Sequence, residues 1–216
     1  MVLDLAGVGS IEQVIPSVSS ITPYPYETIR NRRYDSLIDS FLSGSSARSE
    51  SSPTIFHMGG IPGSGKTTYY KNNRNRFGNY MMIGFDHVME NIDEYRTDNT
   101  TLGSVESYSK WVLVARVMGY ELILRSLKGK LNIFLDHGGL CDPHVSLLRS
   151  AKDYGYRTKM CFIRCGLEVA CERALEREKV THRHIPREII EQRFFMADGY
   201  LEAYRGIVDD LIVIDS

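Results

Sequence analysis

The sequence predicts an α/β fold in which helices cover both faces of a parallel sheet. Short apolar runs that favour strands alternate with segments of helical periodicity along most of the 216 residues. Such alternation is typical of parallel strands joined by right-handed crossovers. Polar clusters follow three of the apolar runs, and sheets of this kind bind ligands at the carboxyl ends of their strands. The clusters are residues 60–68, Asp86-His87 and Asp136-His137.

The composition is that of an ordinary globular protein, with 43% hydrophobic and 25% charged residues. The net charge of −1 argues against nucleic acid as a partner. No apolar run approaches the roughly 18 residues of a membrane helix, and residues 1–15 lack the pattern of a secretory signal. The four cysteines form no CxxC pair, which favours free thiols in a reducing compartment. We therefore expect a cytoplasmic protein without membrane contact.

The N-terminal region, residues 1–52, is predicted to be a helical arm followed by a serine-rich linker. Residues 27–42 have a partly apolar helical face, and residues 43–52 combine serine with glycine and arginine. Residues 53–216 are predicted to form the α/β domain.

The first strand of that domain, residues 54–58, leads into a glycine-rich loop that fits G-x-x-x-x-G-K-[ST], the P-loop motif. Residues 67–73 continue as a helix. The glycines let backbone N–H groups turn toward phosphate oxygens. Lys66 is expected to reach the β- and γ-phosphates of a nucleotide, and the Thr67 hydroxyl is expected to ligate Mg2+. The predicted nucleotide-binding residues are Gly60, Ile61, Pro62, Gly63, Ser64, Gly65, Lys66, Thr67 and Thr68.

The second predicted strand, residues 80–85, ends at Asp86. From this end of the sheet, the Asp86 carboxylate can accept the proton of a hydroxyl that attacks a γ-phosphate. Alternatively, Asp86 is the N-cap of a helix over residues 88–95, and the two roles can coexist. We predict that Asp86 is a general base.

A long helix over residues 104–128 is apolar on most sides, as expected of a helix buried against a sheet. Gly119 on its main face allows close packing, and Gly129 suits its C-terminus. The remaining predicted elements are strands over residues 131–135, 159–163 and 211–214, and helices over residues 143–154, 167–179 and 187–207.

Asp136 follows the third strand, which resembles the end of a Walker B strand that positions Mg2+ through water. Alternatively, Asp136 and His137 bind the second substrate, or Asp136 caps the turn before Gly138-Gly139. We predict that Asp136 and His137 are substrate-binding residues.

Five arginines follow the fourth strand, and arginines stabilise the charge that develops on a phosphoryl group during transfer. Alternatively, they form a solvated helix face, because Glu176 and Glu191 stand three and four residues after two of them. We expect two of the five to be catalytic. They are Arg173, Arg177, Arg183, Arg187 and Arg193.

Five motifs follow one another along the chain: Gly-Gly-x-Pro-Gly-Ser-Gly-Lys-Thr (59–67), Asp86, Asp93-Glu94-Tyr95, Ala-Lys-Asp-Tyr-Gly-Tyr-Arg (151–157), and Arg177 with Arg-His-Ile-Pro (183–186). In this order they resemble the zeta-toxin family of P-loop kinases over about residues 52–196. The resemblance implies a P-loop NTPase three-layer sandwich with a five-stranded parallel sheet of order 2-3-1-4-5. It implies transfer of the γ-phosphate of ATP or GTP to a hydroxyl of a substrate such as UDP-N-acetylglucosamine.

By matching position, the resemblance makes Lys66 the phosphate-binding lysine, Thr67 the metal ligand and Asp86 the base. Arg177 and Arg183 become catalytic arginines of a lid at about residues 178–187, with Arg173 as the alternative. The family commonly has Glu-x-Thr after strand three, whereas this chain has Asp-His-Gly at 136–138, so the acceptor stays open. Many relatives are toxins with an antidote protein, so an antitoxin is a candidate partner.

The same motifs are compatible with three other functions. A polynucleotide 5′-hydroxyl kinase shares the P-loop, the strand-two aspartate and the lid arginines, although the near-neutral charge argues against it. A GTP-binding switch is suggested by Asp136-x-x-Gly139, but no Asn-Lys-x-Asp stands near the end of strand four. A nucleotide-binding scaffold without phosphotransfer is disfavoured by the intact Lys66, Thr67 and Asp86.

Overall fold

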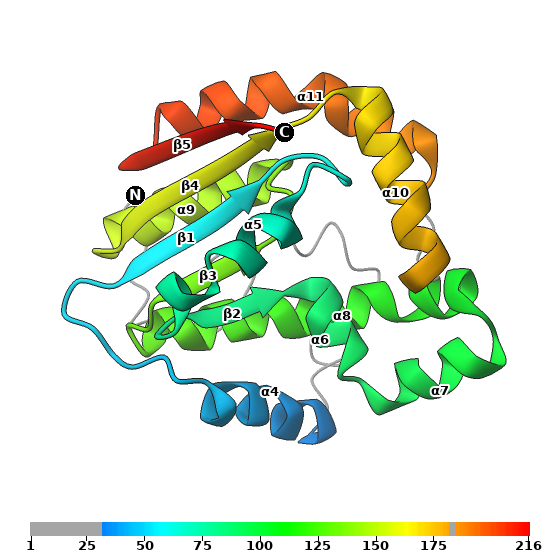
Figure 1. The fold of residues 1–216 in the computed structure, drawn as a ribbon. Coiled ribbons are helices and arrows are strands. Elements are labelled where there is room, and N and C mark those ends of the chain that lie inside the picture. Colours follow the sequence, from blue (N-terminus) through cyan, green and yellow to red (C-terminus); the bar gives the residue numbers. More distant parts are fainter. Residues whose placement is uncertain (1–31, 182–184) are drawn as a thin grey trace.

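The computed structural model describes residues 32–181 and 185–216 and confirms the α/β fold (Figure 1). Its sheet is parallel throughout, in the order β2-β3-β1-β4-β5 that the resemblance implied. Because β1 is central, the loop that follows it starts from the middle of the sheet's carboxyl edge. The strands are β1 (Thr54–Gly59), β2 (Met81–Gly84), β3 (Ile133–Asp136), β4 (Arg157–Arg164) and β5 (Asp210–Asp215).

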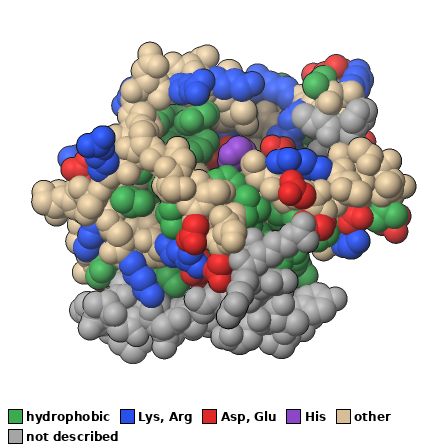
Figure 2. Space-filling view, turned by 90° about the horizontal axis from the view of Figure 1, so that it is seen from below, with side chains coloured by type: hydrophobic (Ala, Val, Ile, Leu, Met, Phe, Trp, Pro, Cys, Tyr) green, Lys and Arg blue, Asp and Glu red, His purple; other side chains and the backbone are tan. Residues whose placement is uncertain are grey.

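Helices cover both faces of the sheet (Figure 1). One face carries α5 (Lys66–Asn72) and the short 3₁₀ helix η2 (Arg74–Phe77), and the other carries α8 (Ser104–Lys128), α9 (Asp142–Asp153) and α11 (Arg187–Arg205). Seen from below, the surface has a recess where hydrophobic side chains and a histidine are visible, with Lys and Arg along its upper rim (Figure 2). The remaining helices are α4 (Arg32–Gly44), α6 (Phe85–Glu90), α7 (Asp93–Thr101) and α10 (Leu167–Thr181).

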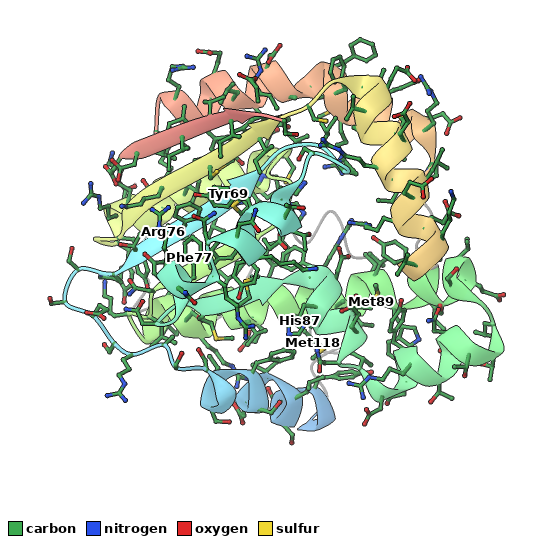
Figure 3. All side chains as sticks on the ribbon, viewed as in Figure 1. Tyr69, Arg76, Phe77, His87, Met89 and Met118 are labelled. Carbon is green, nitrogen blue, oxygen red and sulfur yellow. The ribbon has the colours of Figure 1, made fainter. Side chains whose placement is uncertain are left out.

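Successive residues of β1 enter two different hydrophobic clusters. Ile55 belongs to the larger cluster beneath α8, α9 and α11, whereas Phe56 belongs to a smaller cluster with Phe77, whose ring centroid lies 5.0 Å away. This split follows from the alternation of side chains along a strand. In Figure 3, Phe77 lies beneath α5 and Met118 lies on α8, on the opposite sides of the sheet.

The long helix has the bounds that the sequence predicted. A Cβ built at Gly119 would lie 2.3 Å from Cδ1 of Phe85, so the missing side chain lets this ring pack against α8. Gly129 is the C-cap, as predicted, but its φ of −77° is right-handed. The left-handed backbone conformation is instead found at the next residue, Lys130, which has a φ of 53°. Its ammonium donates to the Tyr154 carbonyl at 2.7 Å and lies 3.4 Å from the Tyr154 ring centroid.

We expect Gly119→Ala to lower the free energy of unfolding by about 1–3 kcal/mol, because the Phe85 ring must move to admit the methyl group. The matched control is Gly199→Ala in α11, where a built Cβ meets no atom within 4 Å. That substitution is expected to stabilise the protein by about 0.5–1 kcal/mol, since alanine favours a helix. Urea unfolding measures both values. Equal stabilisation by the two substitutions would contradict the close packing.

The region after β2 differs from the prediction. The strand ends at Gly84, and Asp86 lies in the first turn of α6. The N-cap of α6 is Gly84, so the interpretation of Asp86 as an N-cap is wrong. The helix predicted over residues 88–95 is also wrong, because α6 and α7 are separate. α6 ends where the Asn91 side-chain amide donates to the His87 carbonyl at 2.8 Å, which satisfies a free carbonyl of the last turn.

Helix α4 contributes to the same core as the sheet. The helix predicted over residues 27–42 is described from Arg32 onward and ends at Gly44. Ile38 is buried in the larger hydrophobic cluster. Arg125 of α8 makes ion pairs with Asp35 at 2.6 Å and Asp39 at 2.7 Å. These contacts fix α4 against α8. Within the described ranges, no helix is long and apolar enough to span a membrane.

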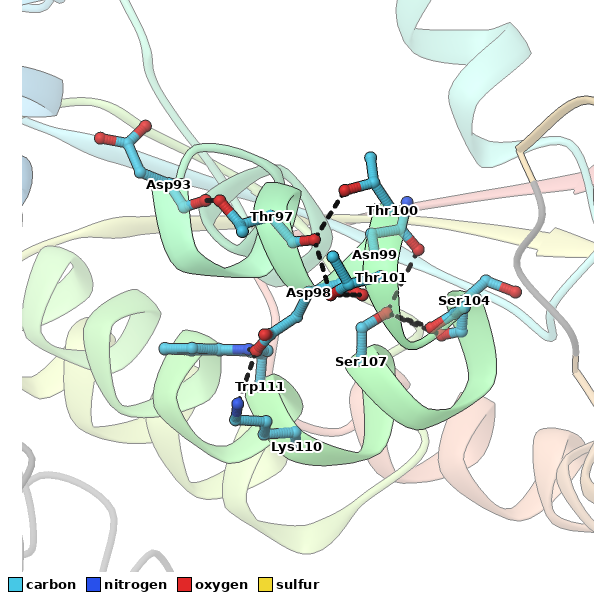
Figure 4. A network of polar contacts seen from close by, with 11 residues as sticks. Asp93, Thr97, Asp98, Asn99, Thr100, Thr101, Ser104, Ser107, Lys110 and Trp111 are labelled. Atoms are coloured by element: carbon cyan, nitrogen blue, oxygen red, sulfur yellow. Dashed lines mark hydrogen bonds and ion pairs between the residues drawn. The ribbon is translucent and has the colours of Figure 1, made fainter.

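Helix α7 is tied to the start of α8 by a polar network (Figure 4). The Trp111 indole donates to Asp98 at 2.6 Å, and the Lys110 ammonium lies 2.7 Å from the same carboxylate. Hydrogen bonds from Lys110 and Trp111 hold the pKa of the Asp98 carboxyl below its usual value. None of the residues of α7 is buried. These polar contacts, together with Tyr95, which packs against the larger hydrophobic cluster, hold α7 in place.

Candidate active site

The loop between β1 and α5 packs tightly against β4 and α10. Gly60 and Gly63 have φ values of 126° and 82°, which side-chain-bearing residues rarely adopt. A Cβ at Gly60 would lie 2.4 Å from the Ile163 carbonyl oxygen, and one at Gly63 would lie 2.2 Å from that of Ala170. Glycine is therefore required at both positions by conformation and by space.

Lys66 is the first residue of α5, and its side chain turns back across the loop. The ammonium donates to the carbonyl oxygens of Gly60 at 2.8 Å and Ile61 at 2.9 Å. Ser64 is buried, and its hydroxyl has no hydrogen-bond partner among the described residues. The Thr67 side chain is exposed beside it. The Lys66 ammonium and the Ser64 hydroxyl can donate hydrogen bonds to phosphate oxygens, and the Thr67 hydroxyl oxygen can ligate a hard cation.

Asp86 and Asp136 lie at the carboxyl ends of neighbouring strands. Asp136 is the last residue of β3 and pairs in register with Met58 of β1 and Gly84 of β2. A Cβ built at Gly84 would lie 3.6 Å from the Asp136 Cβ, and Asp86 follows two residues later. Both aspartates are partly buried. The structure thus brings two carboxylates to the edge of the sheet that carries the P-loop.

The loop after β3 is joined to the P-loop and to α11. The Gly60 N–H donates to the Gly138 carbonyl at 3.0 Å. The Tyr204 hydroxyl donates to the Gly139 carbonyl at 2.5 Å. Between these two bonds, the Gly139 N–H donates to Nδ1 of His137 at 3.2 Å. His137 is therefore held on a short loop with fixed ends.

A cluster of three histidines lies beneath this loop. His57 of β1 and His144 of α9 are fully buried, and their Nε2 and Nδ1 atoms are 2.7 Å apart. The Tyr120 hydroxyl lies 3.3 Å from Nε2 of His144. The His137 ring stacks on His144, with centroids 4.1 Å apart and an interplanar angle of 20°. The sequence analysis missed this cluster, although a histidine between Phe56 and Met58 in an apolar strand was a signal.

The histidine cluster lacks the arrangement of a metal centre, although one nitrogen of each ring lies within 4.8 Å of the others. Nitrogen ligands of tetrahedral Zn2+ stand about 3.4 Å apart, with lone pairs that converge on the ion. The His57–His144 nitrogens are at hydrogen-bond distance instead. Because the rings of His137 and His144 are nearly parallel, their in-plane lone pairs lie in separate planes and do not converge on one ion. We therefore interpret the cluster as a hydrogen-bonded and stacked network.

Burial keeps the three histidines uncharged at neutral pH. Desolvation lowers the pKa of His57 to about 3 and lowers the pKa of His137 and His144 well below the usual value. The neighbouring histidines and the nearby Arg116 and Arg193 guanidinium groups lower the pKa of His137 and His144 further. The structure therefore contains three neutral imidazoles directly below the candidate site.

We expect the free energy of unfolding to fall as the pH drops below 6.5. The unfolded chain then binds protons at these histidines and the folded chain does not, so stability rises with pH throughout this window. The window extends down to about pH 3 for His57. Each histidine contributes about 1.4 kcal/mol per pH unit. Urea unfolding from pH 7 to 5 measures the slope.

His144→Phe is expected to reduce this slope, because it removes one of the neutral imidazoles. His87→Asn, at an exposed histidine, is the control and is expected to leave it unchanged. Unfolding that does not depend on pH in this range would contradict the neutral cluster.

The predicted catalytic arginines lie in and after α10. Arg177 is partly buried within this helix, which continues to Thr181. The predicted lid at about residues 178–187 therefore begins as a helix. Arg183 lies outside the described residues. In Figure 1, α10 leaves the carboxyl end of β4 and extends past the edge of the sheet.

Two of the remaining arginines make structural contacts. Arg187 makes ion pairs with Glu168 and, at 2.8 Å, with Glu191, which confirms the pairing predicted within α11. The pairing of Arg173 with Glu176 is not found. Glu176 pairs with Lys179 at 2.5 Å, and Arg173 donates to the Ser216 hydroxyl at 3.0 Å.

A cavity of about 380 Å³ opens beside the P-loop at the carboxyl ends of β4 and β5. Arg164 stands at this cavity, with its Nε 4.0 Å from Asp198 and 3.9 Å from Asp215. Apolar walls with a few charged groups at the mouth suit a planar ring system. The sequence analysis missed the cavity because its lining comes from distant segments. The lining residues are Ile61, Phe162, Ile163, Arg164, Cys165, Gly166, Phe194, Phe195, Ala197, Asp198, Asp215 and Ser216.

Comparison with known proteins gives one family and several similar folds. The model of the Zeta toxin family matches residues 38–215. No curated protein matches the chain at a significant level. A chain from the PezAT chromosomal toxin-antitoxin system of Streptococcus pneumoniae is 17% identical with a TM-score of 0.69, and the match covers 85% of this chain and 76% of that one.

Two further solved structures have a similar fold. The AvrRxo1-ORF1:-ORF2 complex with ATP matches at 18% identity and a TM-score of 0.55, covering 91% of this chain and 67% of that one. In the complex with sulphate ions, this chain spans 60% of the matched chain. A candidate kinase from Chloroflexus aurantiacus matches at 17% identity and a TM-score of 0.52, covering 76% and 85%. At these sequence identities, the similarity to the solved structures shows a shared fold and nothing about function.

Proposed function

Because the chain belongs to the zeta toxin family, we propose that it is a kinase that transfers the γ-phosphate of ATP or GTP to a hydroxyl of a small molecule. The observation that carries the proposal is the meeting of three groups at one edge of the sheet. Lys66 lies across the P-loop, and Asp86 and Asp136 follow the two strands on one side of it. Phosphate transfer to a hydroxyl requires a cation on the phosphates, a base for the hydroxyl and a group that binds the acceptor.

The nucleotide is proposed to bind with its phosphates in the loop over residues 60–68. Lys66 exchanges its two loop carbonyls for phosphate oxygens, and the free Ser64 hydroxyl donates to the same anion. The Thr67 hydroxyl would hold Mg2+, which neutralises phosphate charge when bound. The purine is proposed to occupy the cavity lined by Ile61 and Arg164, since this cavity adjoins the P-loop.

Asp86 is proposed as the general base for the acceptor hydroxyl, with Asp136 and His137 as acceptor-binding residues. A carboxylate at this edge can take the proton while the oxygen attacks the γ-phosphorus. Arg177 and Arg183 are proposed to stabilise the transferred group from a lid at about residues 178–187. The close contact of Gly63 with Ala170 supports this role, because it joins the base of α10 to the P-loop.

The test is phosphate transfer from γ-labelled ATP or GTP to UDP-N-acetylglucosamine in the presence of Mg2+. Mass spectrometry of small molecules that co-purify with the protein extends the search to other hydroxylated acceptors. A short oligonucleotide with a 5′-hydroxyl is the competing acceptor. Labelling of the oligonucleotide alone would replace the proposal by a polynucleotide kinase. Stoichiometric nucleotide binding without transfer to any acceptor would favour a switch or scaffold.

An antitoxin protein is proposed as a partner. Support comes from two fold neighbours, of which one belongs to a toxin-antitoxin system and the other to a two-protein complex. Co-expression with neighbouring open reading frames, followed by purification through this chain, tests the proposal. A partner of this kind would inhibit phosphate transfer in the assay above.

A further inference from the structure

We propose that His137 binds the phosphate acceptor as a neutral hydrogen-bond donor through Nε2–H, and that His57 and His144 are positioning residues that hold its ring. The inference rests on the proposed kinase function. It assigns a polar atom of the acceptor, a hydroxyl, carbonyl or phosphate oxygen, to a defined nitrogen of this chain. It also gives a role to a buried network that phosphate transfer does not otherwise use.

The position of His137 supports contact with the acceptor. His137 directly follows Asp136, at the carboxyl end of the strand beside β1. The next residue, Gly138, accepts the N–H of Gly60, which is the first residue of the P-loop. His137 as a residue is partly buried, whereas His57 and His144 are fully buried, so it is the member of the cluster open to a ligand at this edge.

The hydrogen bond of His137 to the backbone determines its tautomer. The Gly139 N–H donates to Nδ1 at 3.2 Å, so Nδ1 must carry the lone pair. In a neutral imidazole the proton is then on Nε2, which makes Nε2 a donor. This tautomer also prevents Nε2 from taking a proton, so His137 does not compete with Asp86 as the general base.

The buried network restrains the His137 ring from behind. Its face stacks on His144 at 4.1 Å, and Phe85 lies against it with centroids 5.2 Å apart. His144 cannot rotate freely, because Nδ1 is bonded to His57 at 2.7 Å and Nε2 lies 3.3 Å from the Tyr120 hydroxyl. A rotation of His137 would break the stack and the bond from Gly139 together.

Two substitutions at position 137 test the donor. His137→Gln carries an N–H group at about the position of Nε2, whereas the shorter amide of His137→Asn reaches only about the position of Nδ1 and leaves the Nε2 position without a donor. With UDP-N-acetylglucosamine as the acceptor probe, we expect kcat/KM to fall about tenfold in His137→Asn and to stay within about twofold of wild type in His137→Gln. The KM for ATP should not change in either variant. Equal losses in both variants, or no loss in either, would overturn the inference.

The positioning role is tested by a double-mutant cycle. His144→Phe keeps an aromatic ring under His137 but loses both hydrogen bonds, and we expect kcat/KM for the same probe to fall about threefold to tenfold. In a His137→Ala background, His144→Phe should have no further effect, since there is no ring left to position. Additive losses would show that His144 acts through general stability, and the positioning role would fail.

A spectroscopic measurement separates this inference from the proposed function. NMR of ¹⁵N-histidine-labelled protein reads the tautomer of each ring without any acceptor. We expect His137 to be the Nε2–H tautomer at neutral pH, as its bond from the Gly139 N–H requires. An imidazolium or an Nδ1–H tautomer would overturn the inference even if the kinase is active. If wild type does not phosphorylate the probe, the proposed acceptor class fails, whereas the NMR result still decides the tautomer.

Discussion

Lys66→Ala is expected to lower kcat for phosphate transfer by about 10²–10³ and to weaken nucleotide binding by about tenfold or more. The ammonium is the charge that the structure directs across the P-loop, at 2.8 Å and 2.9 Å from two loop carbonyls. Alanine removes a charged donor to the β- and γ-phosphates. It also leaves the carbonyls of Gly60 and Ile61 without this donor, so the loop is expected to loosen.

The control for this experiment is Lys71→Ala, which removes an exposed lysine from the last turn of the same helix. We expect it to leave kcat and nucleotide affinity near wild type. Calorimetric titration with MgATP and MgGTP gives the affinities, and the labelled-phosphate assay gives kcat. If wild type and Lys66→Ala bind nucleotide equally, the P-loop has no part in binding.

Much of the fold follows from the sequence because its elements have long periodic patterns. The α8 bounds were predicted to the residue, since an apolar face continues over 25 residues and Gly129 ends it. The close packing at Gly119 was also predicted, although its partner Phe85 was not. Phe85 was assigned to the second strand because it is apolar, whereas it is apolar because it packs on Gly119. An apolar residue is expected both in a buried strand and at a contact between helices, so hydrophobicity alone does not distinguish the two.

The candidate site could be predicted only where its residues are close in sequence. The P-loop is a continuous motif, so its residues could be identified directly. The cluster of His57, His137 and His144 joins a strand, a loop and a helix, and no local pattern links them. The cavity at the ends of β4 and β5 was missed for the same reason. Both become visible only when the register of the strands is known.

Asp86→Asn is expected to lower kcat by about 10²–10⁴ while nucleotide affinity and melting temperature stay near wild type. The substitution keeps the size of the side chain and removes its ability to hold a proton. Because the N-cap of α6 is Gly84, Asp86 is not needed to cap this helix. An unchanged melting temperature then shows that a loss of activity in this variant reports on proton transfer rather than on a damaged helix.

The matched control is Glu90→Gln, which neutralises an exposed carboxylate on the same helix and is expected to leave kcat unchanged. The loss in Asp86→Asn should appear in kcat, since proton transfer belongs to the transition state, and the KM for the nucleotide should change little. Normal turnover in Asp86→Asn would exclude this residue as the base. Asp136→Asn would then be the decisive variant, because the Asp136 carboxylate lies at the end of the neighbouring strand, in register with Gly84.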